Sequence, residues 1–230
     1  LSIAYSPCPN DTFIFFHLIH EFTSNKLKFK EELHDVEELN VSAGNEKFDI
    51  TKLSFSAYFN VMDKYILLNS GSALGKNCGP LLIKKKGAVI AQLENQSILV
   101  PGLKTTANLL LSLRLQKKFA PVPTRYDKII PLLEKGEHTL GVIIHEERFT
   151  YEERGFEKVI DLGEWWESET NFPIPLGAIA IKRSLTKEIQ KEVDNALRNS
   201  LDLAWKYPEK TKKYILKHSQ SISEEVVDQH

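Results

Sequence analysis

Short apolar runs alternate along this chain with longer segments in which apolar residues recur every third or fourth position. A short apolar run is typical of a strand, and the wider spacing is typical of an amphipathic helix. The alternation predicts an α/β protein with mostly parallel strands. We expect strands at residues 1–5, 38–41, 48–50, 66–68, 80–83, 97–100, 139–144, 159–161 and 178–181. We expect helices at residues 12–21, 54–64, 106–117, 127–135 and 187–205.

Two segments look like crossovers between lobes. The first is K-K-K-G-A-V-I-A-Q-L-E-N-Q, residues 84–96, and the second is N-F-P-I-P-L-G-A-I-A-I-K-R, residues 171–183, where two prolines enforce an extended path. They predict a discontinuous first lobe, residues 1–96 and 178–230, and an inserted second lobe, residues 97–177, with a ligand cleft between them. One continuous doubly wound sheet with two surface loops is the alternative.

The charge balance excludes one class of partner. The chain of 230 residues carries 30 basic and 31 acidic residues, a net charge of -1, without the broad positive footprint of a nucleic-acid binder. No stretch approaches the ~18 uninterrupted apolar residues of a membrane span. The N-terminus lacks the basic and long apolar regions of a signal peptide, although the chain starts at Leu1. We therefore expect a cytoplasmic protein that binds a small molecule and contacts neither nucleic acid nor membrane.

The chain has two cysteines, Cys8 and Cys78. Two cysteines cannot form a disulfide framework, and without a C-x-x-C motif or a nearby histidine pair they do not resemble a zinc site. We expect reduced thiols without a catalytic role. A cysteine nucleophile and a single bridge between the two are the alternatives.

The loop S-P-C-P-N-D-T follows the first expected strand. In open α/β sheets, ligands collect beyond the carboxyl ends of the strands, close to helix N-termini. Asn10, Asp11 or Thr12 can cap the next helix, while Ser6 and Asn10 can direct polar atoms toward a ligand. Capping alone is the alternative interpretation.

The segment T-K-L-S, residues 51–54, follows another expected strand. Thr51 or Ser54 can cap a helix here, and Lys52 adds a positive charge. Caps are common, so this segment by itself indicates a binding site only weakly.

The stretch P-G-L-K-T-T-A is more informative, because Thr105 and Thr106 open an apolar helix directly after a Pro-Gly turn. Their hydroxyl and N–H groups can bind a carboxylate or a phosphate. The stretch lacks the G-x-x-x-x-G-K-[ST] spacing, so it is not a nucleotide-binding P-loop.

His145 is the strongest single candidate for a catalytic residue. It ends the apolar run L-G-V-I-I, which places an imidazole at a strand tip, where it can exchange a proton near neutral pH. A structural role is the alternative. The following E-E-R-F-T-Y-E-E-R favours a solvated helix face with Arg148 as a possible clamp, and Trp165 and Trp166 favour packing over stacking on a ligand.

Several motifs together resemble one family. They are spread along almost the whole chain, and in chain order they read S-P-C-P-N-D-T-F, T-K-L-S, G-S-A-L-G, C-G-P-L, P-G-x-x-T-T-A, R-Y-D, G-V-I-I-H-E-x-R-F-T-Y, L-G-x-W-W-E and P-x-P-L-G. Their order resembles that of the 1,4-dihydroxy-6-naphthoate synthase family of the futalosine route to menaquinone. Family members continue beyond the terminal I-S-E-E-V-V-D-Q-H, so we expect a truncated C-terminus inside a helix that Ser223 caps.

The resemblance implies a two-lobed fold like that of the type II periplasmic binding proteins. It implies a lyase that converts cyclic dehypoxanthinyl futalosine, a substrate with a carboxylate, to 1,4-dihydroxy-6-naphthoate. The family's general base falls on His145. The substrate-binding positions that it implies are Lys52, Leu53, Ser54, Thr105 and Thr106.

This chemistry requires no metal, nucleotide or redox cofactor, and we expect none. Two other functions are open. A chorismate dehydratase of the same pathway would share the fold and the carboxylate pocket, although the S-P-C-P-N-D-T and H-E-x-R-F-T-Y motifs favour the naphthoate synthase. A non-catalytic solute-binding protein would bind its ligand without turnover.

Overall fold

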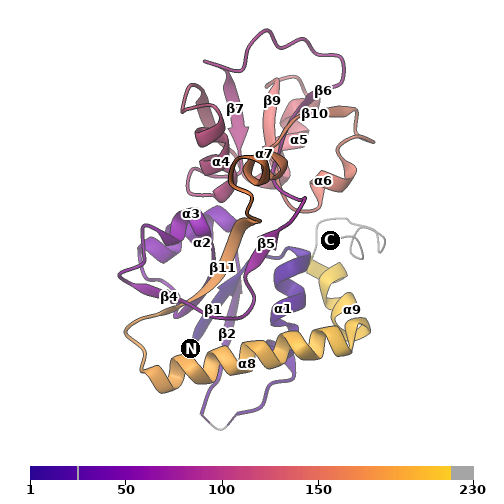
Figure 1. Ribbon diagram of the computed structural model, residues 1–230. Coiled ribbons are helices and arrows are strands. Elements are labelled where there is room, and N and C mark those ends of the chain that lie inside the picture. The colour runs from indigo at the N-terminus through magenta and orange to yellow at the C-terminus, as the bar shows by residue number, and fades with distance from the viewer. Residues whose placement is uncertain (25, 219–230) are drawn as a thin grey trace. The chain divides into compact units, whose positions relative to one another are not determined.

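The chain forms two β-sheets, each in a unit of its own (Figure 1). The computed structural model describes residues 1–24 and 26–218. The first unit contains Leu1–Ala73 and the segment that begins at Gly177, and the second unit contains Leu74–Leu176. The helix expected to begin at Ser223 lies outside the described residues.

The sheet of the first unit is mixed. β1 (Ser2–Tyr5) runs parallel to β2 (Lys30–Leu33) and to β3 (Ile50–Ser54). β11 (Ile174–Lys182) lies between β3 and β4 (Tyr65–Leu67) and runs antiparallel to both. The prediction of mostly parallel strands is therefore wrong, because the chain re-enters this sheet in the opposite direction after the second unit.

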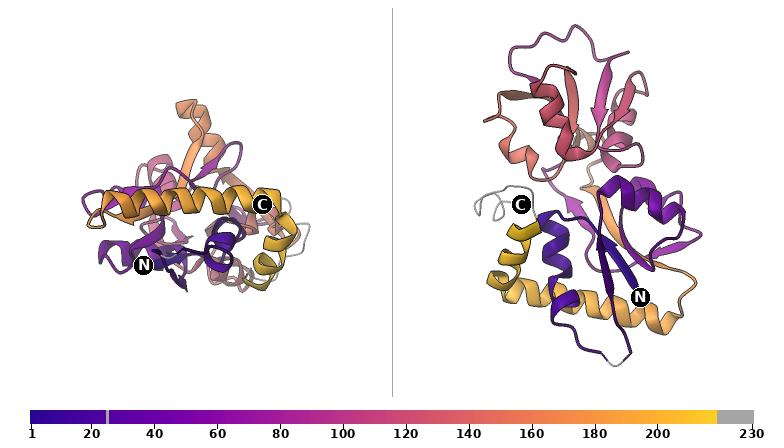
Figure 2. Two further views of the ribbon diagram at one scale, coloured as in Figure 1. Left: turned by 90° about the horizontal axis from the view of Figure 1, so that it is seen from below. Right: turned by 180° about the vertical axis from the view of Figure 1, so that it is seen from behind.

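Helices cover one face of this sheet through a continuous apolar core. α1 (Pro9–His20) and α8 (Lys187–Lys206), the long orange helix of Figure 1, bury their apolar faces against Ile3 and Ile179. α9 (Pro208–His218) lies beside α1, as both views of Figure 2 show. The predicted helix at 187–205 and the helical segment after Tyr207 agree with this arrangement.

A further helix, α2 (Val36–Gly44), occupies residues for which the sequence predicts a strand at 38–41, and that prediction is wrong. Asp35 caps the helix by accepting a hydrogen bond from a first-turn backbone N–H at 2.9 Å. Leu39 and Ala43 are fully buried and stand four positions apart, which is a helical spacing.

The sheet of the second unit is also mixed. Its strands in spatial order are β10 (Phe156–Asp161), β6 (Leu81–Lys85), β9 (Leu140–Ile143), β7 (Ser97–Val100) and β8 (Ala120–Pro123). The central strand β9 is parallel to β7 and antiparallel to β6. This unit's helices are α4 (Thr106–Arg114), α5 (Tyr126–Glu134), α6 (Glu147–Thr150) and α7 (Leu162–Thr170). Apolar residues of α4 and α7 share one buried cluster, and those of α5 belong to another.

The division into units differs from the predicted lobes mainly at the first boundary. The segment 84–96, expected as the first crossover, lies in the second unit, because β6 pairs with β9 and β10. The chain leaves the first unit after Ala73 and returns at Gly177, one residue before the predicted start at 178. The connecting strands, β5 (Ala73–Gly75) and β11, pair with each other.

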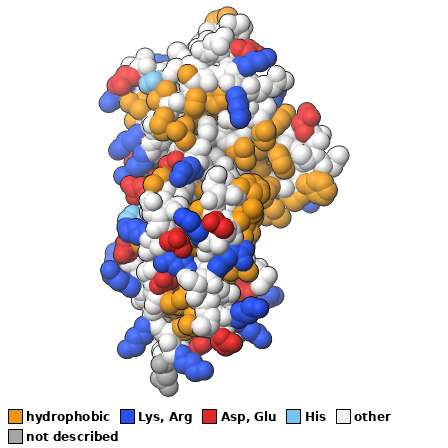
Figure 3. Space-filling view, turned by 90° about the vertical axis from the view of Figure 1, so that its left-hand side faces the viewer, with side chains coloured by type: hydrophobic (Ala, Val, Ile, Leu, Met, Phe, Trp, Pro, Cys, Tyr) orange, Lys and Arg blue, Asp and Glu red, His pale blue; other side chains and the backbone are white. Residues whose placement is uncertain are grey.

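The surface carries charges of both signs. Figure 3 shows lysine and arginine side chains interspersed with acidic ones on the face it displays, without one extended region of either sign. Among the described helices, none has the length and apolar character needed to cross a membrane.

Candidate active site

Ser6, Asp11 and Lys52 form one buried network in the first unit. The Asp11 Oδ2 atom accepts a hydrogen bond from the Ser6 backbone N–H at 3.0 Å and another from the Ser6 hydroxyl at 2.8 Å. The Lys52 ammonium donates to Oδ1 of the same carboxylate at 2.5 Å. All three residues are buried. The network therefore ties the loop after β1 to strand β3.

Charge pairing keeps both ends of this network ionised. Burial by itself raises the pKa of Asp11, but the Lys52 charge and the hydrogen bonds from Ser6 outweigh it and hold that pKa below its ordinary value. Burial by itself lowers the pKa of Lys52, but the Asp11 charge more than compensates and holds it above its ordinary value. The Lys52 ammonium thus has its counter-ion within the protein.

The first turn of α1 differs from the predicted one. The helix begins at Pro9 with Cys8 as its N-cap residue, and the cap has no side-chain hydrogen bond. Asp11, one of the predicted caps, instead bonds to Ser6 and Lys52 because it faces the sheet. Asn10 is half-buried in the first turn.

The structure does not favour a catalytic role for Cys8. Burial and then the neighbouring Asp11 charge raise the pKa of the Cys8 thiol to about 12. The reactive thiolate is therefore scarce at neutral pH. Cys8 and Cys78 are both free thiols in the structure.

Ser54 ends β3 and precedes the short helix α3 (Phe55–Tyr58). Its backbone N–H donates to Asn40 Oδ1 at 2.9 Å, and its hydroxyl oxygen accepts from Asn40 Nδ2 at 3.1 Å. It makes no side-chain capping bond, contrary to its expected role as a cap. Because Asn40 uses the hydroxyl oxygen as an acceptor, the hydroxyl hydrogen can be donated to a ligand.

Leu53 can offer a ligand only backbone atoms. Its side chain is fully buried in an apolar cluster with Ala43 and Val61. Gly177 of β11 lies directly against it, and a Cβ atom there would be 3.2 Å from the Leu53 carbonyl oxygen and 3.1 Å from Lys52 Cε. Glycine at 177 therefore permits the close approach of β11 to β3.

Thr105 and Thr106 begin α4 in the second unit, as predicted. The Thr105 hydroxyl oxygen accepts from the Asn108 backbone N–H at 3.2 Å and its hydrogen is donated to the Gly102 carbonyl at 2.7 Å. The Thr106 hydroxyl donates to the Leu176 carbonyl at 2.8 Å. These hydroxyls thus fix the turn, and the groups directed outward at a helix start are its first backbone N–H groups.

His145 follows β9 in an unusual backbone conformation. Its φ of 56° lies in the left-handed region, which is uncommon for a residue other than glycine. Its ring packs edge-to-face on Tyr126 of α5, with 5.2 Å between the ring centroids. Such outliers cluster at functional sites, and His145 is half-buried, so it is both held in place and accessible.

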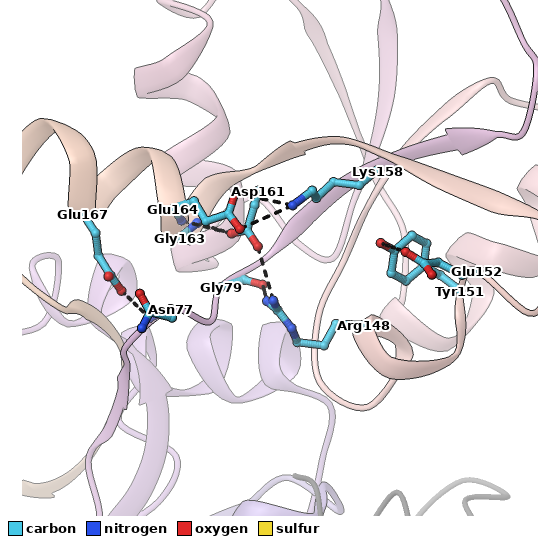
Figure 4. Close-up of polar contacts among 10 residues, drawn as sticks. All are labelled: Asn77, Gly79, Arg148, Tyr151, Glu152, Lys158, Asp161, Gly163, Glu164 and Glu167. Carbon is cyan, nitrogen blue, oxygen red and sulfur yellow. Dashed lines mark hydrogen bonds and ion pairs between the residues drawn. The ribbon is translucent and has the colours of Figure 1, made fainter.

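Arg148 is not a free clamp. Its guanidinium donates to the Gly79 carbonyl and pairs with Asp161 at 3.2 Å, as Figure 4 shows. Asp161 also caps α7 by accepting from the backbone N–H groups of Gly163 at 2.9 Å and Glu164 at 3.0 Å. This network joins α6 to α7.

Two residues next to His145 are buried acids that the sequence analysis missed. Glu146 and Glu147 were expected on a solvated helix face, but they are only 5% and 8% exposed. The expectation is wrong because α6 is too short to separate a polar face from an apolar one. Trp165 and Trp166, by contrast, pack against the second unit's core as expected.

Parallel neighbours bring the candidate residues together within each unit. β1 and β3 are parallel neighbours, and so are β7 and β9, so the loops after each pair lie at one edge of a sheet. The first unit contains Ser6, Asn10, Lys52, Leu53 and Ser54, and the second unit contains Thr105, Thr106 and His145. No described group of histidines, cysteines and acids is arranged to hold a metal ion.

Sequence comparisons point to one family. A family model described as "Menaquinone biosynthesis" matches residues 1–229. A curated "1,4-dihydroxy-6-naphtoate synthase" from Thermus thermophilus is 44% identical over 230 residues, which is 100% of this chain and 84% of the relative. A protein of the same name from Streptomyces coelicolor is 37% identical over 235 residues, which is 100% of this chain and 83% of the relative.

Structural comparisons confirm the predicted fold class. A crystal structure of a protein from Archaeoglobus fulgidus has a TM-score of 0.93 and 34% identity, covering 99% of this chain and 85% of that one. The alkanesulfonate-binding protein of Xanthomonas axonopodis pv. citri has a TM-score of 0.77 and 12% identity, and the match covers 100% of this chain and 82% of that one. At this identity the likeness is one of fold alone. The α/β fold is thus of the two-lobed, periplasmic-binding-protein-like kind.

Proposed function

The chain belongs to the menaquinone biosynthesis family, and from this premise we propose that it is the lyase that converts cyclic dehypoxanthinyl futalosine to 1,4-dihydroxy-6-naphthoate. Its curated relatives, similar over the full chain, are named as synthases, so the chain is an enzyme of this pathway. The reaction would take place in the cytoplasm, where we expect the other steps that supply its substrate.

His145 would act as the general base. The observation that carries this role is its position directly after β9, in a left-handed turn that holds a half-buried imidazole against Tyr126. In its neutral form the imidazole would remove a carbon-bound proton that the substrate ketone activates. Eliminations would then expel the sugar-derived fragment while the second ring becomes aromatic.

Backbone donors at the start of α4 would hold negative charge on the substrate. The hydroxyls of Thr105 and Thr106 already donate to protein carbonyls, so the N–H groups of the first helical turn are the donors for a carboxylate or a developing enolate. The threonines would act by fixing that turn.

Residues of the first unit would orient the substrate. The Ser54 hydroxyl, held by Asn40, can donate to a substrate oxygen. The Lys52 ammonium is paired with the Asp11 carboxylate, so its charge is already neutralised within the protein. Its remaining N–H groups would donate hydrogen bonds to the ligand. Ser6 and Asn10 would line the same edge of the sheet as Lys52.

The test is turnover by the purified protein. Cyclic dehypoxanthinyl futalosine is added to the wild type, to His145→Asn and to His138→Asn, a matched control on the turn before β9, and the naphthoate is followed by absorbance and mass. We expect His145→Asn to lose about 10²- to 10⁴-fold in turnover while still binding substrate, because a positioned base supplies about that factor. His138→Asn should match the wild type.

Two results would contradict the proposal. Wild-type turnover in His145→Asn would remove this residue from the role of base. Substrate binding by the wild type without any product would favour the alternative of a solute-binding protein.

A further inference from the structure

Glu146 and Glu147 follow His145 directly and are buried without charge compensation. Their Oε2 atoms have no hydrogen-bond partner among the described residues. Neither side chain takes part in an ion pair within the described part of the chain, whereas the nearby acids Glu134 and Asp127 do. A buried carboxylate without a partner is costly, so these two side chains favour the neutral, protonated form.

The charges around Glu147 favour the same form. Burial, and then the nearby carboxyl of Glu146, raise the pKa of Glu147 to about 8. Asp127 and Glu134 of α5 face it with further negative charge, and Arg154 is the cation that opposes them.

Most of that opposing charge is already used. Arg154 donates to Glu134 Oε1 at 2.9 Å from both Nε and Nη2. Asp127 in turn pairs with Arg125 at 2.8 Å and with Lys128 at 3.4 Å. Ionised Glu147 would therefore face the Asp127 and Glu134 carboxylates of α5 and the carboxyl of Glu146 without a cation of its own.

The same two helices position His145. The His145 carbonyl accepts from the Arg148 backbone N–H at 3.4 Å, and the Glu147 carbonyl accepts from the Tyr151 N–H at 3.1 Å, so both carbonyls belong to the α6 turn. On the other side, the His145 ring packs on Tyr126, the residue before Asp127 in α5. A displacement of the α6 turn at Glu147 thus reaches His145 through the backbone bond between the His145 carbonyl and the Arg148 N–H.

We propose that Glu147 is a positioning residue whose protonated side chain keeps the α6 turn, and with it His145, in place, and whose ionisation displaces that turn and lowers activity. The inference rests on the proposed role of His145 as the base. It has a distinctive consequence, because a histidine base by itself stays neutral and active at alkaline pH. Activity should instead fall on the alkaline side as Glu147 ionises.

The first test compares pH profiles of kcat for the wild type, Glu147→Gln and the matched control Glu153→Gln, an exposed acid a few residues further on. Each protein is normalised to its own value at neutral pH. Wild type and Glu153→Gln should lose about tenfold between roughly pH 7 and 9, and Glu147→Gln should keep its activity over that range. A merely structural role would lower the activity of Glu147→Gln equally at every pH and leave the alkaline fall in place, which would overturn the proposal.

A second measurement needs no substrate. The unfolding temperature of the wild type should fall relative to that of Glu147→Gln as pH rises from about 5 to about 8, because only the wild type must then bury or protonate a carboxylate. Curves that stay parallel would overturn the proposal. If the wild type makes no product at any pH, the proposed function fails, and these unfolding curves still decide the protonation of Glu147.

Discussion

Two buried clusters of polar groups, one in each unit, are in opposite states. In the first unit, Asp11 is fully engaged by Ser6 and Lys52, and each charge has its counterpart. In the second unit, Glu146 and Glu147 are buried with oxygens that lack partners among the described residues, next to His145. Satisfied networks give a rigid surface for binding, whereas strained and uncompensated groups cluster where chemistry occurs. On the proposed function, the first unit's network supports substrate binding, and the second unit holds the reacting base beside the backbone donors at the start of α4.

The largest expected effect on stability comes from breaking the satisfied network. Asp11→Asn leaves the buried Lys52 ammonium without its counter-ion, which should lower the free energy of unfolding by about 3–5 kcal/mol. Urea unfolding of the wild type and the variant measures it. Lys30→Gln, which removes one partner of the exposed pair with Glu32, is the control and should cost less than about 1 kcal/mol. Equal costs for the two variants would show that the network contributes little.

The two units should also respond to pH with opposite signs. The pKa of Asp11 is lowered, so its contribution is present above its ordinary value of 3.8 and is lost as pH falls through the lowered value. The pKa of Glu147 is raised, so its contribution is present below the ordinary value of 4.5 and is lost as pH rises toward about 8.

Urea unfolding at a series of pH values checks both signs. Relative to the wild type, Glu147→Gln should gain on the order of 4 kcal/mol between acid and mildly alkaline pH. Asp11→Asn should instead lack the wild type's loss at acid pH. If both variants deviate from the wild type in the same pH range, the contrast between the units fails.

A smaller difference in stability is expected between variants that remove a helix cap in each unit. Asp35→Ala in the first unit removes a cap bond to α2, which should cost about 1 kcal/mol. Asp161→Ala in the second unit removes two cap bonds and also the partner of Arg148, so it should cost more, about 2–3 kcal/mol. Thermal unfolding of both variants measures the difference. A smaller cost for Asp161→Ala would mean that the link between α6 and α7 is unimportant.

The sequence predicted the elements whose pattern is set by burial. The buried strands β7 and β9 and the amphipathic helices α4, α5 and α8 follow from apolar runs and helical spacing. β2 was missed because its residues K-E-E-L form a polar edge strand without an apolar run. The strand predicted at 38–41 was wrong because Leu39 and exposed Val41 resemble an alternation, although the burial of Leu39 and Ala43 is helical.

The candidate site was predictable in its parts but not in its contacts. The position of His145 after an apolar strand and the start of α4 at the two threonines could be read locally. The pairing of Asp11 with Lys52 joins residues 41 positions apart, so it depends on the parallel pairing of β1 and β3. The burial of Glu146 and Glu147 is a property of the folded unit that the local run of charged residues does not reveal.

The division between binding and reaction is tested most directly by measuring kcat and KM for Ser54→Ala and His145→Asn side by side with the futalosine substrate. We expect Ser54→Ala to raise KM by about tenfold with kcat nearly kept, because one hydrogen bond to the substrate is lost. We expect His145→Asn to lower kcat by about 10²- to 10⁴-fold with KM nearly kept. If instead Ser54→Ala lowers kcat and His145→Asn raises KM alone, the proposed roles of Ser54 in binding and of His145 in the chemical step are contradicted.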